Sequence, residues 1–143
     1  MSTDARSVVE NLYAAWKARD LPRVLALCSD DMTFALHIPA DVLPIGGETT
    51  GKAAVAAALQ GLLDTYDFLA YEPESVSSEG ATTTAVVHFR YRHKVTGEVI
   101  DGQLRHAWLV EGGKAVRLDE WHDLDKVKVF LGRVALLSAA RPS

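Results

Sequence analysis

Two successive segments of this chain alternate in side-chain character, and this alternation constrains the fold more than any other feature. Every second residue from 102 to 110 is apolar or a glycine, except for one histidine (Gly102, Leu104, His106, Trp108, Val110). The next segment repeats the pattern with Val116, Leu118, Glu120 and His122. Because successive side chains of a β-strand point to opposite faces, each set shares one sheet face. The sequence therefore predicts a mostly apolar sheet face that contains an imidazole and a carboxylate.

The turn before the first of these strands predicts its register against the preceding strand, 83–93. A two-residue turn at Thr96-Gly97 makes His106 face Val87 and makes Asp101 face Arg92. The apolar side chains then lie on one face and the charged ones on the other. Since a slip by one residue would mix the two sets, the hydrophobic pattern favours this register.

The second turn brings the two polar residues of the apolar face together. A three-residue loop over 112–114 keeps Val110 opposite Val116 and places His106 directly across from Glu120. Residues paired in this way have Cβ atoms about 4.5–5.5 Å apart. A two-residue loop would place His106 opposite Asp119 and turn the apolar residues of the last strand to the other face. We therefore expect the three-residue loop and a contact between His106 and Glu120.

Periodicity and capping signals predict three helices in the first half of the chain and one at its end. The first begins with a cap at residues 2–4 and runs to about Ala18, and the second follows Asp20 with Pro22 in its first turn. The third runs from Gly51 to Leu63, and the last covers 125–137. Strands are predicted over 32–38, 68–77, 83–93, 99–110 and 115–123, with an edge or bulge at Pro73, and a loop over 39–50. No repeat or linker divides the chain, so we expect one α+β domain over 1–143.

Composition excludes several classes of partner. Of the 143 residues, 48% are hydrophobic and 24% charged, the balance of a soluble globular domain. The net charge of -4 argues against a nucleic-acid surface. The longest apolar run, 53–59, is too short to cross a membrane, and the chain opens without a signal-peptide pattern, so we expect a cytoplasmic protein. Cys28 is the only cysteine, which excludes an internal disulfide; we expect a buried structural thiol within a helical segment.

Several short motifs occur in a fixed order along nearly the whole chain. They are Tyr13-Ala14-Ala15-Trp16, Arg19-Asp20-Leu21, Leu27-Cys28-Ser29-Asp30-Asp31, Thr50-Gly51-Lys52-Ala53-Ala54-Val55, Gly113-Lys114-Ala115-Val116 and Trp121-His122-Asp123. Their order resembles that of the nuclear-transport-factor-2-like superfamily, nearest to the SnoaL-like polyketide cyclase and ketosteroid isomerase branch. The resemblance implies a cone-shaped, highly curved antiparallel sheet wrapped by the three N-terminal-half helices and a C-terminal helix. This cystatin-like α+β barrel encloses an apolar pocket and is usually dimeric.

The resemblance also implies which chemistry to expect. Ketosteroid isomerases carry a base in the first strand and a tyrosine in the first helix, where this chain has Leu36 and Leu12. Limonene-epoxide hydrolases need a tyrosine and an asparagine in the first strand, where this chain has Phe34 and Leu36. SnoaL-type cyclases place a histidine on the penultimate strand and an aspartate on the last. His106 and Glu120 match those two positions, with glutamate in place of aspartate.

We therefore expect His106 and Glu120 to be an acid/base pair. Burial would raise the pKa of Glu120 and a neighbouring imidazolium would lower it; a purely structural pair remains the alternative. His106, Glu120 and His122 would suit zinc, yet no metal-ligand spacing supports such a site, so we expect neither a metal nor a cofactor. His37 has the opposite parity to its apolar neighbours. The residues expected to bind the ligand are Leu12, Tyr13, Trp16, Leu36, Phe89, Tyr91, Leu104, Trp108, Leu118 and His122.

Three functions remain open from the sequence. The first is an enzyme without a cofactor, an isomerase, cyclase, dehydratase or hydrolase, acting on a hydrophobic carbonyl-bearing or cyclic substrate. The second is a binding protein that holds an apolar small molecule without turnover, and the third is a dimerising interaction module. An apolar strip on the opposite sheet face predicts a homodimer interface, unless the C-terminal helix covers its tryptophan (Val86, Ala107, Leu109, Trp121).

Overall fold

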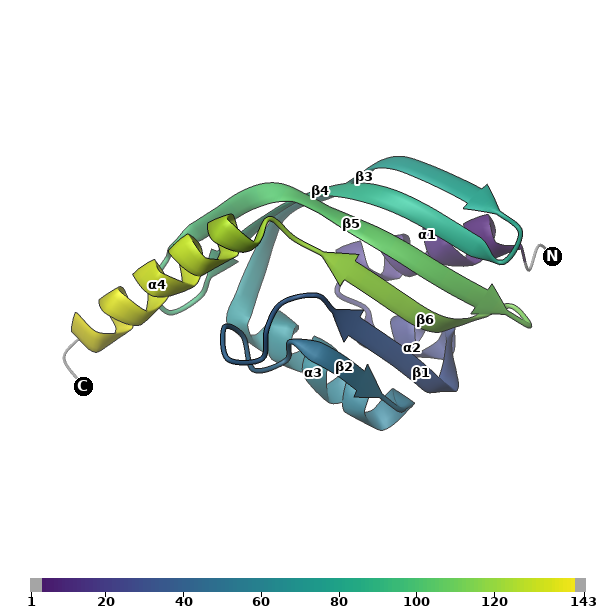
Figure 1. Ribbon diagram of the computed structural model, residues 1–143, viewed down its shortest axis with the longest axis horizontal. Helices are drawn as coiled ribbons and strands as arrows, with labels where there is room; N and C mark the ends of the chain where they lie inside the picture. The colour runs from purple at the N-terminus through teal and green to yellow at the C-terminus, as the bar shows by residue number, and fades with distance from the viewer. Residues whose placement is uncertain (1–3, 141–143) are drawn as a thin grey trace.

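The computed structural model describes residues 4–140, and within this range it contains six strands in one strongly curved sheet and four helices (Figure 1). The helices are α1 (Ala5–Lys17), α2 (Leu21–Ala26), α3 (Lys52–Thr65) and α4 (Leu124–Ala140). The strands are β1 (Cys28–Leu36), β2 (Gly47–Thr50), β3 (Tyr66–Glu79), β4 (Thr82–His93), β5 (Val99–Glu111) and β6 (Lys114–Trp121). The α+β class and the wrapping of the sheet by helices are confirmed.

The sheet has the order β2-β1-β6-β5-β4-β3 and curves without closing (Figure 1). Neighbouring strands are antiparallel except for β1 and β6, which are parallel. This pairing places the first strand of the chain beside the last, so β6 lies in the middle of the sheet. Residues of β6 therefore have neighbours on both sides, which fixes their side chains more firmly than an edge strand would.

Capping residues begin the first helices where the sequence predicts. The Asp4 side chain accepts a hydrogen bond from the Ser7 backbone N–H at 2.8 Å, and residues 2 and 3 of the predicted cap lie outside the described range. Asp20 accepts in the same way from Arg23 at 3.2 Å. These bonds satisfy backbone donors that the helix itself leaves unpaired. The predicted starts of both helices are confirmed.

Two predictions in the first third of the chain are wrong. Cys28 does not lie in a helix but opens β1, because β6 pairs with the chain there: Cys28 lies opposite Ala115, whose backbone N–H donates to the Leu27 carbonyl at 2.9 Å. The thiol is buried, as predicted, and burial raises its pKa to about 11. The predicted loop over 39–50 ends in strand β2, because residues 47–50 add to the free edge of β1.

The turn between β4 and β5 is longer than predicted. The Gly97 N–H donates to the His93 carbonyl and the His93 N–H to the Glu98 carbonyl, both at 2.8 Å, which leaves four residues in the loop. The strands are shifted by two positions, so Ala85 rather than Val87 faces His106. An even shift moves no side chain to the other face, so the apolar face remains as predicted.

The same shift changes the ion pairs on the outer face. Asp101 does not pair with Arg92; it faces Arg90 and bonds His88 at 2.8 Å instead. Arg92 reaches Asp67 of β3 at 3.0 Å. These pairs are exposed and contribute little to stability, so the error does not affect the fold.

Strands β5 and β6 pair His106 with Glu120 as predicted, but the turn between them differs from the prediction. Its loop contains two residues, Gly112 and Gly113, and a β-bulge follows, so Ala115 rather than Val116 faces Val110. The extra residue of a bulge shifts the register by one position. His106 consequently lies opposite Glu120, as predicted, although the predicted three-residue loop is wrong.

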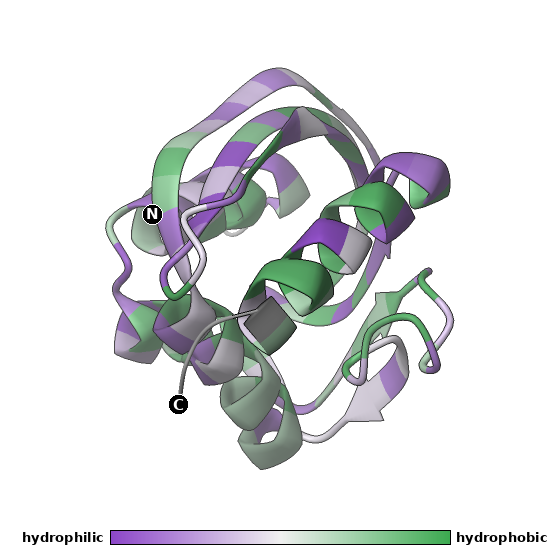
Figure 2. Cartoon of the chain, turned by 90° about the vertical axis from the view of Figure 1, so that its left-hand side faces the viewer, coloured by the Kyte–Doolittle hydropathy of each residue, from purple (hydrophilic) through white to green (hydrophobic). Residues whose placement is uncertain are grey.

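The helices enclose the concave face of the sheet. The side chains of α1 that pack there include Val9 and Leu12, which are essentially inaccessible to solvent. Helix α4 crosses the open end of the curved sheet (Figure 2). Its first turns are anchored by Val127 and Phe130, each 6% exposed, and by Lys126, which donates to the Asp101 carbonyl at 2.7 Å. The inner face of the sheet is therefore the floor of an enclosed space.

Over residues 4–140, no helix combines the length and apolar character needed to cross a membrane.

Candidate functional site

The concave face of the sheet, α1, α3 and α4 together surround an apolar cavity of about 120 Å³. A cavity of comparable size holds a molecule of about the size of benzene. A larger ligand would place one ring inside and extend through the open end. The residues that line the cavity include all those predicted to bind ligand except Leu104, which is 2% exposed and packs in the core instead (Leu12, Tyr13, Trp16, Leu36, Phe89, Tyr91, Trp108, Leu118, His122).

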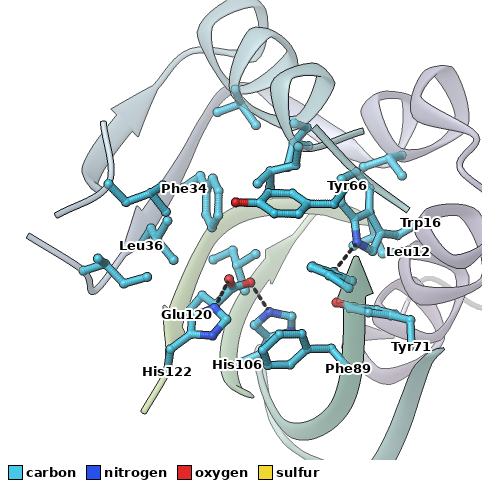
Figure 3. Close-up of a pocket in the computed structure, with 18 of the residues that line it drawn as sticks. Leu12, Trp16, Phe34, Leu36, Tyr66, Tyr71, Phe89, His106, Glu120 and His122 are labelled. Carbon is cyan, nitrogen blue, oxygen red and sulfur yellow. Dashed lines mark hydrogen bonds and ion pairs between the residues drawn. The ribbon is translucent and has the colours of Figure 1, made fainter. Parts of the chain in front are cut away.

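A chain of hydrogen bonds runs along one wall of this cavity, and Figure 3 shows the part of it between His106, Glu120 and His122. The Trp108 indole N–H donates to the Tyr13 hydroxyl oxygen at 2.9 Å, and that hydroxyl lies 2.7 Å from His106 Nδ1. On the other side of its ring, His106 Nε2 lies 2.6 Å from Glu120 Oε1. His122 Nε2 bonds the second carboxylate oxygen, Oε2, at 2.7 Å. The predicted contact between His106 and Glu120 is present, and two further side chains hold it.

The donors in this chain determine where the protons lie. An indole nitrogen can only donate, so the Tyr13 oxygen accepts from Trp108. We assign the Tyr13 O–H as the donor to His106 Nδ1, because no other acceptor among residues 4–140 bonds this hydroxyl, which belongs to a side chain only 4% exposed. With this assignment His106 carries its proton on Nε2 and donates it to Glu120.

Glu120 is the ionised member of the group. Burial by itself would raise its pKa, but hydrogen bonds from His106 and His122 outweigh burial and hold the pKa well below its usual range. Charge interactions with His106 and His122 lower the pKa of Glu120 further. The Glu120 side chain is 15% exposed and the His106 side chain 2%. Both ring nitrogens of His106 are occupied within the protein, so Glu120 is the better placed of the two to meet a ligand.

Sequence reasoning missed two tyrosines of the cavity wall, Tyr66 and Tyr71. The predicted strand begins only at residue 68, and residues five apart on a regular strand lie on opposite faces. It also named Tyr13 and Trp108 only as ligand-binding residues and predicted no hydrogen bond between them, although a tyrosine and a tryptophan in an apolar site usually find a hydrogen-bond partner. No other sequence signal would have identified the chain of bonds.

His37 lies outside the site, as its parity indicates. Its ring stacks on Trp121 with centroids 4.6 Å apart, and its Nε2 bonds Asp119 at 2.9 Å. Within residues 4–140, no cluster of histidine, cysteine and carboxylate side chains has the arrangement of a metal site. The Nε2 atoms of His106 and His122 are instead at N–H···O distance from the Glu120 carboxylate.

Comparison with known proteins identifies the family. Residues 9–118, most of the chain, match the family model of the SnoaL-like domain. The chain belongs to this family. No match was found among curated proteins.

Solved structures share the SnoaL-like fold along almost the whole chain. An NTF2-like protein of unknown function from Burkholderia pseudomallei has 23% identity and a TM-score of 0.81, covering 92% of this chain and 98% of its own. TerC co-crystallised with polyporic acid has 16% identity and a TM-score of 0.78, covering 88% and 96%. A candidate SnoaL-like polyketide cyclase from Mesorhizobium loti has 16% identity and a TM-score of 0.68, covering 81% and 97%. At these identities the likeness establishes the cone fold of this SnoaL-like protein.

The low pKa of Glu120 predicts a specific loss of stability in acid. Because the folded-state pKa lies below the unfolded value of about 4.3, the native state binds fewer protons, and the stabilisation is complete above that value and lost as pH falls. The free energy of unfolding, measured with urea, should fall between about pH 6 and about pH 3 in both proteins. The fall should be larger in wild type than in Glu120→Gln by at least about 1 kcal/mol, which corresponds to a shift of one pKa unit. Glu111→Gln, at an exposed position, should behave as wild type. An equal acid loss in wild type and Glu120→Gln would contradict this account of Glu120.

Proposed function

We propose that this SnoaL-like protein is a cytoplasmic enzyme that works without a cofactor, by general acid/base catalysis on a hydrophobic carbonyl-bearing or cyclic substrate. The reaction is an isomerisation, cyclisation, dehydration or hydrolysis. The observation that carries the proposal is an ionised carboxylate, held by two imidazoles, in the wall of an otherwise apolar cavity. Titratable groups placed in this way in a cavity are enriched at active sites.

The chemistry assigned to the group follows from its hydrogen bonds. In the simplest step, the Glu120 carboxylate takes a proton from a carbon next to the substrate carbonyl, and the electron pair of the broken C–H bond forms an enolate. Glu120, now a carboxylic acid, returns the proton to a different atom, so the reaction needs no redox partner. His106 and His122 fix the carboxylate in one orientation, and the Tyr13–Trp108 pair fixes His106 in turn. The apolar walls keep water from competing for the proton.

Proton abstraction can be tested without knowing the natural substrate. The probe is 2-tetralone, a ring ketone with acidic C–H bonds beside its carbonyl, incubated with the protein in deuterium oxide. NMR should show wild type accelerating the loss of these C–H signals, and Glu120→Gln reducing the protein-dependent rate about 100-fold or more, the usual contribution of a positioned acid or base. Glu111→Gln serves as the matched control and should retain the rate. Exchange that is no faster with protein than with buffer would contradict the proposal.

A binding protein without turnover is the second candidate, and one observation favours it. Both nitrogens of His106 are satisfied within the protein, and such a closed network can simply hold a buried carboxylate. The two candidates differ in the role of Glu120. A pure binding protein would bind 2-tetralone yet leave its C–H signals unchanged in deuterium oxide.

We also propose that two copies associate through the outer sheet face. Trp121 is 41% exposed there, so α4 does not cover it, and half-buried apolar side chains lie on the same face of β4 and β5 (Val86, Ala107, Leu109). Exposed aromatic residues within an apolar strip are typical of interfaces. Sedimentation velocity should show a dimer for wild type and at least tenfold weaker association for Trp121→Ala. Val95→Ala, at an exposed turn residue, should not change association. An unchanged dimer in Trp121→Ala would remove this face from the interface.

A further inference from the structure

Two tyrosine hydroxyls face the cavity without a hydrogen-bond partner among the residues that the structure describes. Tyr66 is 9% exposed and Tyr71 is 5% exposed, and both line the cavity. Figure 3 shows their hydroxyl oxygens directed into it. No enclosed polar side-chain atom of the described residues lacks a partner, so neither of these unpaired hydroxyl oxygens is fully enclosed. The other two tyrosines differ, since Tyr13 is bonded to Trp108 and Tyr91 accepts from Trp16 at 3.4 Å.

An irregularity in β3 brings these two side chains to the same face. Tyr66 lies opposite His93 and Tyr71 opposite Phe89, but Leu69 has no partner because the register shifts between Phe68 and Ala70. Without this β-bulge, two residues five positions apart would point to opposite faces of the sheet. The extra residue turns outward, where Leu69 is 43% exposed. Bulges commonly redirect side chains beside functional sites.

The surrounding rings hold the two tyrosines in place. Tyr91 stacks between them, with ring centroids 5.9 Å from Tyr66 and 6.4 Å from Tyr71. Arg19 donates to the Tyr66 and Leu63 carbonyls at 3.1 and 2.6 Å, which fixes the start of β3. The hydroxyls are therefore positioned before any ligand arrives.

Both hydroxyls are donors rather than anions. Burial raises the pKa of Tyr66, and burial together with nearby Tyr91, Glu120 and Tyr13 raises that of Tyr71. Neither phenol O–H has an acceptor among residues 4–140, and a largely buried donor without an acceptor is unfavourable. A ligand that supplies an acceptor would remove this cost, whereas a pure hydrocarbon would not.

We propose that Tyr66 and Tyr71 form an acceptor-recognition pair, which selects ring ligands that carry a carbonyl or other acceptor oxygen over hydrocarbons of the same shape. This inference deepens the proposed function, on which its link to catalysis rests. Either hydroxyl can donate to an acceptor oxygen on a ligand whose ring packs against the apolar walls. In the proposed reaction, the hydroxyl bonded to the carbonyl oxygen would stabilise negative charge that develops there.

The test measures the affinity of two proteins for each of two ligands. The ligands are 2-tetralone and tetralin, which share a ring system and differ by the carbonyl oxygen. The proteins are wild type and the double variant Tyr66→Phe/Tyr71→Phe, which keeps both rings. NMR titration should show the double variant binding 2-tetralone about fivefold or more weakly, the effect of one lost hydrogen bond, with tetralin affinity unchanged. The single variants divide the effect between the two hydroxyls.

Thermal unfolding separates recognition from a structural role. Because the two hydroxyls have no partner in the protein, the double variant should melt at the wild-type temperature or above it. Tyr13→Phe should melt lower, since it removes the partner of both Trp108 and His106. A lowered melting temperature in the double variant would indicate a structural role and overturn the inference.

The binding titrations test the recognition pair directly. The inference is overturned if wild type does not bind 2-tetralone, if the double variant binds it as wild type does, or if tetralin affinity falls equally. These results are independent of deuterium exchange: exchange in wild type with unchanged binding by the double variant would refute the recognition pair alone. Loss of ketone binding in the double variant, without exchange in wild type, would refute only the proposed catalysis.

Discussion

The carboxylate of Glu120 is buried between two imidazoles, and the rest of the site is arranged so that it remains ionised there. Burial opposes a charge, and the hydrogen bonds from His106 and His122 overcome that opposition. Both imidazole rings must be held in place for their N–H groups to point at the carboxylate. His106 is held by Tyr13 and Trp108, which are 95 residues apart in the sequence and meet because α1 packs against the concave face of β5.

The fold contributes the position of this carboxylate as well as its partners. Glu120 lies on β6, which is central in the sheet because β1 pairs with it in parallel, opposite β5 on the other side. A central strand is held by hydrogen bonds along both edges and has little freedom to shift. The carboxylate consequently faces the cavity from a strand paired on both sides, whereas α4, at the open end, is anchored mainly through its first turns.

Sequence periodicity predicted most of the five longer strands and the meeting of His106 with Glu120, but it missed β2 and the start of β1. Those predictions succeeded although two turns were wrong, because the β4–β5 shift was even and a bulge in β6 corrected the β5–β6 loop. The bulge at Leu69 had no comparable signal, since an unpaired residue in an edge strand looks like any other residue in sequence. The proton positions were equally inaccessible, because they depend on which distant donors reach Tyr13.

The protonation of His106 tests the central claim most directly. Long-range proton–nitrogen NMR of the wild-type protein at neutral pH distinguishes the two ring nitrogens and their protons. This account predicts a neutral ring that carries its proton on Nε2, bonded to Glu120, with Nδ1 unprotonated and accepting from Tyr13. In Tyr13→Phe this preference should weaken. An imidazolium in wild type, or a proton on Nδ1, would contradict the assigned hydrogen bond from the Tyr13 hydroxyl to His106.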